Sequence, residues 1–315
     1  MMRAALVRAY GEPPQLEDFG DPSANGQGEL VVEVLAAGLN PVDLHLASGD
    51  YVGGSPPLPY VAGREGVGRT ADGQRVYFDA PIPPHGSFAQ RAVVAAESCV
   101  SLPDGVDDGL AIACGIAGRA AWLSLEYRAR LQPGETVLVL GASGTVGQIA
   151  IQAATLMGAG PVLAAARSDD GLRRAGELGA SATVKLDGER GAIVDRMRAA
   201  APDGIDVVID PVWGSPAEAA VEALAPRGRL VQLGAAAGER ASFSSNAVRG
   251  KALTILGHVS WLTPRDVARA AYERLSEHAA RGELTADVEQ LPLADVAEAW
   301  ERQGSGPGCK LVLVP

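Results

Sequence analysis

The sequence predicts a two-domain α/β protein in which a doubly wound parallel sheet is inserted into a β-rich domain. The chain has 315 residues, enough for about two domains of ordinary size. Its first third contains short apolar or alternating runs broken by glycine and proline, a pattern typical of antiparallel strands. In its middle third strands and helices alternate, which is typical of a parallel sheet covered by helices.

The expected elements follow from local hydrophobic periodicity. The first third should contain strands at 4–7, 30–35, 74–78 and 89–94. The alternating part should contain strands at 136–140, 162–166, 205–209 and 230–233, with helices at 146–157, 171–178 and 216–224. Helices at 264–281 and 296–302 and a strand at 310–314 complete the chain.

The last strand has no neighbour unless it returns to the first domain's sheet. We therefore expect residues 1–112 and 257–315 to form one domain, interrupted by the parallel-sheet domain at 113–256. Residues 253–257 should form an apolar edge strand of the open sheet, which pairing with a second copy of the chain would protect.

The composition excludes several classes of function. Lys and Arg number 27 against 38 Asp and Glu, giving a formal net charge of −11, and no basic run is present. Such a chain is a poor partner for nucleic acid or an anionic membrane. No apolar run approaches the roughly 20 residues of a membrane span, and the N-terminus lacks the apolar core of a signal peptide. We therefore expect a cytoplasmic protein.

The cysteines do not indicate a disulfide framework. Cys99, Cys114 and Cys309 are widely spaced, odd in number, and form no Cys-x-x-Cys pair. Their number also excludes a structural four-cysteine metal site.

A glycine loop, Gly141–Gly147, joins a predicted strand to a predicted helix. Small residues there let the backbone approach a pyrophosphate, and the helix N-terminus offers N–H groups and a partial positive charge. A tight turn without a ligand is the alternative. The residues that we assign to a dinucleotide cofactor in this region are Ser143, Gly144, Thr145 and Val146, with Leu233, Gly234 and Ala235 after a later strand.

Arg167 and Ser168 follow the second strand of the alternating part, where an NAD-binding protein usually carries an acidic residue. A carboxylate would repel a 2′-phosphate, whereas a guanidinium and a hydroxyl can bind it. We therefore expect NADPH as the cofactor. A solvated surface arginine, followed by Asp169 and Asp170, is the alternative reading.

Five segments together resemble the medium-chain dehydrogenase/reductase superfamily in its zinc-free quinone oxidoreductase branch, which includes zeta-crystallin. They are Ala36–Asp43, Gly63–Gly68, Leu131–Val139, the glycine loop and Lys310–Leu313. The resemblance covers nearly the whole chain. It implies a GroES-like catalytic domain that carries a Rossmann domain, and it favours a homodimer. One departure is Gly171, where a lysine is usual in the family.

The zinc-dependent members of that superfamily hold their catalytic metal with a cysteine, a histidine and a third Cys or His. Asn40 and Arg64 stand at the first two of these positions here, and Cys114 stands near the third. An amide and a guanidinium cannot replace a thiolate and an imidazole on Zn²⁺. We therefore expect no metal.

The resemblance also places Asn40 and Tyr51 beside the nicotinamide and the substrate carbonyl. The implied reaction is hydride transfer from NADPH to an enone or quinone, with Tyr51, a backbone N–H or a water polarising the carbonyl. His45 stands where the family often has a tyrosine. It is either a proton relay or a packed histidine.

The expected function is therefore that of an NADPH-dependent, zinc-independent oxidoreductase acting on a quinone or an α,β-unsaturated carbonyl compound. Two alternatives share the nucleotide site. One is a tailoring reductase or dehydrogenase for a biosynthetic intermediate such as an enoyl thioester. The other is a non-catalytic NADPH-binding protein with a structural or redox-sensing role.

Overall fold

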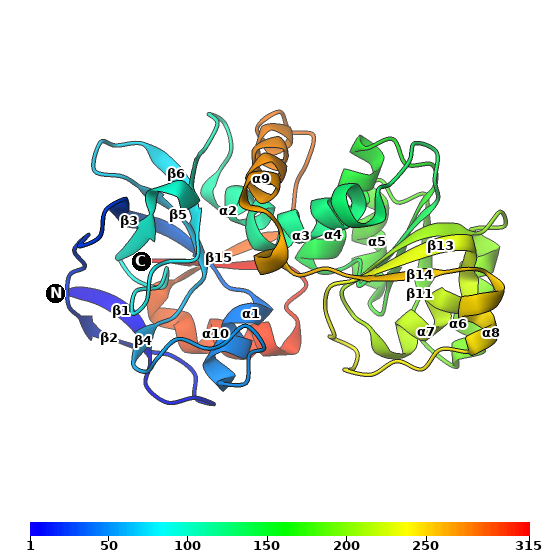
Figure 1. Ribbon diagram of the computed structural model, residues 1–315, viewed down its shortest axis with the longest axis horizontal. Coiled ribbons are helices and arrows are strands. Elements are labelled where there is room, and N and C mark those ends of the chain that lie inside the picture. Colours follow the sequence, from blue (N-terminus) through cyan, green and yellow to red (C-terminus); the bar gives the residue numbers. More distant parts are fainter. The chain divides into compact units, whose positions relative to one another are not determined.

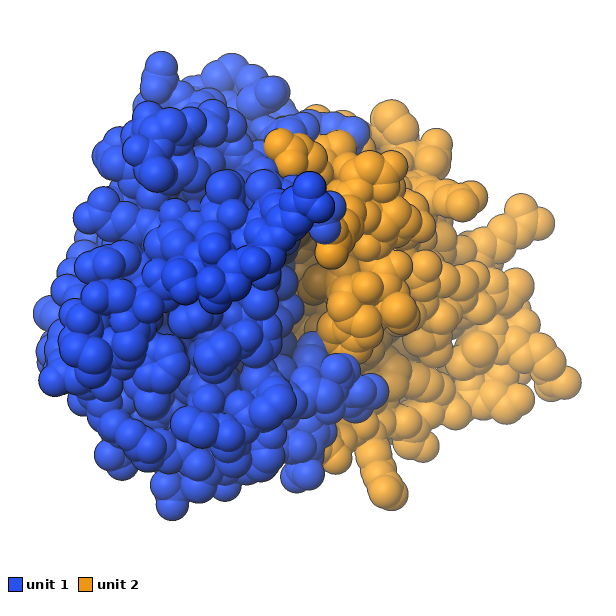
Figure 2. Space-filling view, turned by 60° about the vertical axis from the view of Figure 1, so that its left-hand side comes forward, with its two compact units in different colours: residues 1–116, 272–315 blue, residues 117–271 orange.

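The computed structural model describes residues 1–315, which divide into two compact units (Figure 2). Unit 1 comprises Met1–Ile116 and Tyr272–Pro315, and unit 2 comprises Ala117–Ala271. The inserted unit begins at Ala117 rather than residue 113 and ends at Ala271 rather than 256. The later end has a structural reason, because the backbone N–H of His258 donates to Gln232 O and holds the following segment on the inserted sheet.

Unit 1 contains a seven-stranded sheet in the order β15-β16-β3-β5-β6-β8, with β7 paired to β3. These strands are β3 (Glu29–Gly38), β5 (Glu65–Arg69), β6 (Arg75–Asp79), β7 (Arg91–Ala95), β8 (Cys99–Ser101), β15 (Val288–Pro292) and β16 (Lys310–Val314). A second sheet has the order β2-β1-β4 and consists of β1 (Met2–Val7), β2 (Gln15–Phe19) and β4 (Tyr60–Val61).

The last strand returns to the first sheet, as predicted. β16 pairs antiparallel with β3, with Val312 opposite Gly38 and Leu313 opposite Ala37. Leu311 and Leu313 are completely buried in the core of unit 1, together with Phe78 on β6. Burial of these side chains, worth about 1.5–3 kcal/mol each, makes the C-terminal strand an integral part of this unit.

Short helices connect the strands of unit 1. They are α1 (Pro41–Ser48), α2 (Asp108–Ala113) and α10 (Val296–Ser305), with 3-10 turns at Ala96–Ser98 and Leu293–Asp295. A π-helical turn, Cys114–Gly118, leads from unit 1 into unit 2, and α9 (Arg265–Ala280) leads back. No helix of the chain has both the length and the apolar composition that a membrane crossing requires.

Unit 2 is a parallel sheet in the order β11-β10-β9-β12-β13-β14, which confirms the doubly wound Rossmann fold. Its strands are β9 (Val137–Leu140), β10 (Val162–Ala166), β11 (Ala182–Lys185), β12 (Ile205–Asp210), β13 (Leu224–Gln232) and β14 (Thr254–Gly257). The strand order reverses beside β9, so a ligand crevice is expected at the carboxyl ends of β9 and β12.

The helices of unit 2 cover both faces of this sheet, with α6 and α7 together on one face (Figure 1). They are α3 (Arg119–Leu123), α4 (Thr145–Leu156), α5 (Asp169–Glu177), α6 (Arg190–Ala200), α7 (Gly214–Ala223) and α8 (Ser245–Gly250), with short turns at Ser124–Ala129 and Ser260–Leu262. The prediction missed β11 and α6. β11 buries only Val184 fully, so its sequence lacks the apolar run that marks the central strands.

Candidate active site

The glycine loop lies at the carboxyl end of β9 and begins α4. Gly141 has a φ of +61°, in the left-handed region that glycine adopts without strain. At Gly147 a Cβ atom would lie 2.5 Å from Gly141 O and 2.6 Å from Ala142 Cα. The first turn of α4 therefore packs directly on the loop, which leaves the helix N-terminus and its N–H groups at the loop's open end.

The second strand, β10, ends beside this loop. Arg167 is exposed and has no ion-pair partner in the chain. Ser168 caps α5, because its Oγ accepts a hydrogen bond from Gly171 N at 3.0 Å. The hydroxyl proton of Ser168 remains available to a phosphate oxygen, since the cap uses only the oxygen's acceptor capacity.

Gly171 brings the start of α5 against the glycine loop. A Cβ atom here would lie 2.5 Å from Ser143 Cβ and 2.7 Å from Ser168 Oγ. These distances are too short for any side chain on the present backbone. The structure therefore explains the departure noted in the sequence, because a lysine at this position would push α5 away from the loop.

Lys185 is a positively charged residue at the carboxyl ends of the parallel strands, and the sequence analysis did not predict it. It ends β11 and lies opposite Ala166 in the parallel register, and its ammonium pairs with the Asp169 carboxylate. The carboxyl ends of neighbouring parallel strands meet at one edge, so Lys185 lies on the strand next to the one that leads into Arg167. Recognition of β11 in the sequence would have revealed it.

The loops after β12 and β13 are held together by Asp210. Its carboxylate accepts hydrogen bonds from Val212 N at 2.9 Å and Trp213 N at 2.8 Å, and Leu233 N donates to Asp210 O at 2.9 Å. Burial raises the pKa of Asp210 to about 6. A Cβ atom on Gly234 would lie 2.5 Å from Pro211 O. Only glycine at this position therefore lets the predicted cofactor residues 233–235 pack against the loop that follows β12.

In unit 1, the side-chain amide of Asn40 is fully engaged within the protein. Its Oδ1 accepts from Lys310 Nζ at 2.6 Å, and its Nδ2 donates to Glu65 Oε1 at 2.9 Å and to Gly38 O at 3.2 Å. The residue is 3% exposed and precedes α1. Because both amide hydrogens are used, the structure favours a positioning role for Asn40 over donation to a substrate.

Glu65 and Lys310 form a buried ion pair, with Lys310 Nζ 2.7 Å from Glu65 Oε1. The other oxygen, Glu65 Oε2, accepts from the Tyr77 hydroxyl at 2.9 Å and from Ile116 N at 2.7 Å. Lys310 also donates to Leu39 O at 3.2 Å. A buried pair is stable only when its remaining hydrogen-bonding capacity is satisfied, and this one meets that condition.

Tyr51 and His45 lie together. Tyr51 begins the loop after α1 and is half-buried, while His45 on α1 is exposed. Their rings stack with centroids 6.5 Å apart and an interplanar angle of 23°. Burial raises the pKa of Tyr51, and the positive charge of Arg64 partly opposes this effect. The phenol is therefore a protonated hydrogen-bond donor at neutral pH.

Asn40, Arg64 and Cys114 stand at the positions that bind zinc in related dehydrogenases. No three His, Cys, Asp or Glu side chains gather in a way that could hold an ion. The Cys114 thiol is completely buried, and burial raises its pKa to about 12. The thiol is therefore protonated at neutral pH.

Comparison with known proteins agrees with this architecture. Residues 26–104 match the family described as the alcohol dehydrogenase GroES-like domain, and residues 145–277 match the family described as zinc-binding dehydrogenase. Quinone oxidoreductase-like protein 2 of Mus musculus is 30% identical over 266 residues, which cover 81% of this chain and 74% of that protein.

Two further relatives cover almost the whole chain. The quinone oxidoreductase from Thermus thermophilus, solved also in complex with NADPH, has a TM-score of 0.86 and 31% identity, with both chains covered completely. One of the phenolphthiocerol/phthiocerol polyketide synthase proteins of Mycobacterium tuberculosis is 32% identical over 331 residues, 96% of this chain but 14% of that protein. The resemblance inferred from the sequence is thereby confirmed: the chain belongs to the medium-chain dehydrogenase/reductase superfamily, in its quinone oxidoreductase branch.

Proposed function

We propose that the chain is an NADPH-dependent reductase that works without zinc and transfers hydride to a quinone or an α,β-unsaturated carbonyl compound. The observation that supports this most strongly is the nucleotide site of unit 2. There a glycine loop packs closely on α4, and Arg167, which has no ion-pair partner, follows the neighbouring strand β10. Such a site suits a dinucleotide with an additional phosphate. The complex of the Thermus thermophilus relative with NADPH supports the same cofactor.

The residues of this chain would have distinct tasks in the reaction. The glycine loop and the start of α4 bind the pyrophosphate, and Arg167 with Ser168 binds the 2′-phosphate. When bound, NADPH supplies the hydride. Tyr51 donates its O–H to the substrate carbonyl as negative charge develops on the oxygen. Asn40, held by Glu65 and Lys310, fixes the start of α1 and so the segment that carries His45 and Tyr51.

A reductase acting on an enoyl thioester is the second candidate. It is favoured by one observation, the 32% identity over 96% of this chain to part of a polyketide synthase protein. The chemistry at Tyr51 would be the same, because a thioester carbonyl also accepts charge after hydride transfer. A panel containing quinones, simple enones and enoyl thioesters distinguishes the two, with NADPH oxidation as the measurement.

Replacement of Arg167 tests the cofactor. We expect Arg167→Ala to raise the Kd for NADPH by about 10- to 100-fold, because a charge-assisted contact to the 2′-phosphate is lost. The Kd for NADH should not change. Fluorescence titration measures both, and Arg249→Ala, which removes an exposed arginine on α8, is the control. An unchanged NADPH/NADH ratio in Arg167→Ala would show the assignment to be wrong.

Replacement of Tyr51 tests whether its hydroxyl is the hydrogen-bond donor to the substrate carbonyl. We expect Tyr51→Phe to lower kcat by roughly 10- to 1,000-fold with little effect on NADPH affinity, since one donor to the developing oxyanion is removed. Tyr127→Phe, which alters an exposed tyrosine of unit 2, should keep its activity. A fully active Tyr51→Phe enzyme together with an inactive His45→Gln enzyme would instead assign the donor role to His45.

The proposal requires no metal. Asn40 and Arg64 offer zinc no ligand, so elemental analysis of the dialysed protein should find zinc far below one atom per chain. Treatment with a strong chelator should leave NADPH oxidation unchanged. About one tightly bound zinc per chain would contradict this prediction.

We further propose a homodimer formed through β14. This strand is the edge of the inserted sheet, and Ile255 on it is 38% exposed. Pairing of two such edges would satisfy their free backbone groups. Light scattering at micromolar concentration should give twice the chain mass of 32.3 kDa. Ile255→Lys should shift the protein toward a monomer, whereas a monomeric wild-type protein would exclude the dimer.

A further inference from the structure

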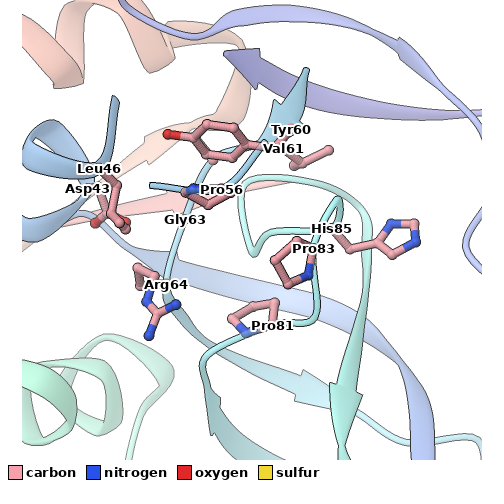
Figure 3. A pocket seen from close by; sticks show the side chains of 11 residues that line it. Asp43, Leu46, Pro56, Tyr60, Val61, Gly63, Arg64, Pro81, Pro83 and His85 are labelled. Carbon is pink, nitrogen blue, oxygen red and sulfur yellow. The ribbon is translucent and has the colours of Figure 1, made fainter. Parts of the chain in front are cut away.

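A small cavity lies within unit 1, beside α1 (Figure 3). Its lining includes Asp43 and Leu46 from α1, Tyr60 from β4, Arg64, and His85 from the loop before β7. About 20 Å³ of its space is open to a water-sized molecule. That exceeds the roughly 10–15 Å³ that one water needs, so the cavity has room for a water but not for an organic substrate.

Three buried polar atoms of this lining have no hydrogen-bond partner in the chain: Asp43 Oδ1, the Tyr60 hydroxyl and, on the side away from Asp43, His85 Nδ1. Asp43 is 3% and Tyr60 5% exposed. The other carboxylate oxygen, Asp43 Oδ2, accepts from Asn40 N at 2.8 Å. In Figure 3 the Tyr60 hydroxyl is turned toward the side of the cavity on which Asp43 lies. One water between them would satisfy both atoms, which would otherwise remain desolvated at a cost.

Asp43 can hold a proton at neutral pH. Burial raises its pKa to about 7, although the hydrogen bond from Asn40 N and the charges of Lys310 and Arg64 act in the opposite direction. The negative charge of Glu65 raises it further. Burial also raises the pKa of Tyr60, so this group stays a phenol.

His85, the remaining titratable group of the lining, does not face Asp43. Its ring packs edge-on against Phe19 with centroids 6.0 Å apart, and it points away from Asp43 in Figure 3. Asp43 is therefore the carboxyl group whose proton the cavity can exchange. Arg64 also lines the cavity, and its positive charge lowers the pKa of both Asp43 and Tyr51.

We propose that this cavity is a hydrated proton store for the reduction. A water bridges Asp43 Oδ1 and the Tyr60 hydroxyl, and the acid form of Asp43 supplies through that water the proton that the reduced substrate takes up. The inference rests on the proposed reductase function and adds to it the source of the proton, which Tyr51 alone does not explain, because a phenol is a weak acid at neutral pH.

The step balances. Hydride addition breaks one C–H bond of NADPH, forms one C–H bond on the substrate, and leaves an enolate or hydroquinone anion. The Asp43 O–H bond then breaks, the water takes that proton, and the water's own proton passes to the anion. Asp43 remains as a carboxylate and regains a proton from solvent before the next turnover. Asp43 thus acts through water and positions a proton without contacting the substrate.

Two conservative variants test whether Asp43 and the bridging water hold the proton. Asp43→Asn keeps an acceptor for Asn40 N but cannot release a proton, and Tyr60→Phe removes the second partner of the water while Asp43 stays in place. Asp104→Asn and Tyr127→Phe, which alter exposed side chains elsewhere, are matched controls. The four variants and the wild type are compared for folding by circular dichroism and for the Kd of NADPH, which should not change.

The first readout does not depend on activity. Infrared difference spectra across neutral pH should show the C=O band of a protonated carboxyl group that disappears with a midpoint near 7 in the wild type. The component with a midpoint near 7 should be absent from Asp43→Asn and shifted in Tyr60→Phe, whereas a component with a midpoint near 6 belongs to Asp210 and should remain in both variants. A wild-type spectrum without the component near 7, or its survival in a folded Asp43→Asn protein, would overturn the proposal.

The second readout is the pH dependence of kcat. The wild-type kcat should fall as pH rises through about 7, because the acid form of Asp43 is lost. In Asp43→Asn, kcat should be at least about tenfold lower below that pH and should no longer titrate there, with KM little changed. An Asp43→Asn enzyme with the wild-type profile would overturn the proposal. A wild type that binds NADPH but reduces no substrate would refute the reductase function instead, and the infrared band would still decide whether the cavity stores a proton.

Discussion

The buried ion pair between Lys310 and Glu65 is the interaction on which unit 1 depends. It joins the last strand of the chain to β5 and, through Asn40, to the start of α1. The same Glu65 carboxylate accepts from Ile116 N, the last residue before the chain enters unit 2. Removal of one partner would leave an uncompensated buried charge, at a cost of about 3–5 kcal/mol. This one ion pair thus fixes the start of α1 and links the C-terminal strand to the point at which the chain enters unit 2.

In unit 2 the corresponding constraint is close packing rather than charge. Gly147 and Gly171 lie where any Cβ atom would meet backbone or Ser143 at 2.5 Å. The first glycine brings α4 onto the loop, and the second brings α5 onto it. Both helix starts therefore lie close to the same atoms of the loop, and the N-terminus of α4 offers its N–H groups there. The absence of a lysine at 171 is a condition of this packing.

The elements with strong local signals could be predicted from the sequence. The central strands of unit 2, the glycine loop and the return of the last strand follow from runs of apolar residues and from the need of each strand for a partner. β11 was missed, and Lys185 with it, because a strand at the polar margin of a sheet lacks an apolar run. Lys310 could not be assigned a role, since its partners lie 245 and 270 positions away in the chain.

The sequence also could not show which buried polar groups of unit 1 have all their hydrogen bonds made within the protein. This difference distinguishes residues with a structural role from residues that can take part in chemistry. Asn40 and Glu65 are buried with their hydrogen-bonding capacity used, so they hold their neighbours but exchange nothing with a ligand. Asp43 and Tyr60 are equally buried, yet each keeps one atom without a partner. A fold tolerates such atoms only where water or function compensates for them. Asp43 therefore keeps an oxygen through which it can take up and release a proton, and the Tyr60 hydroxyl remains free to hold the water that carries it, although both residues come from the same part of the fold as Asn40 and Glu65.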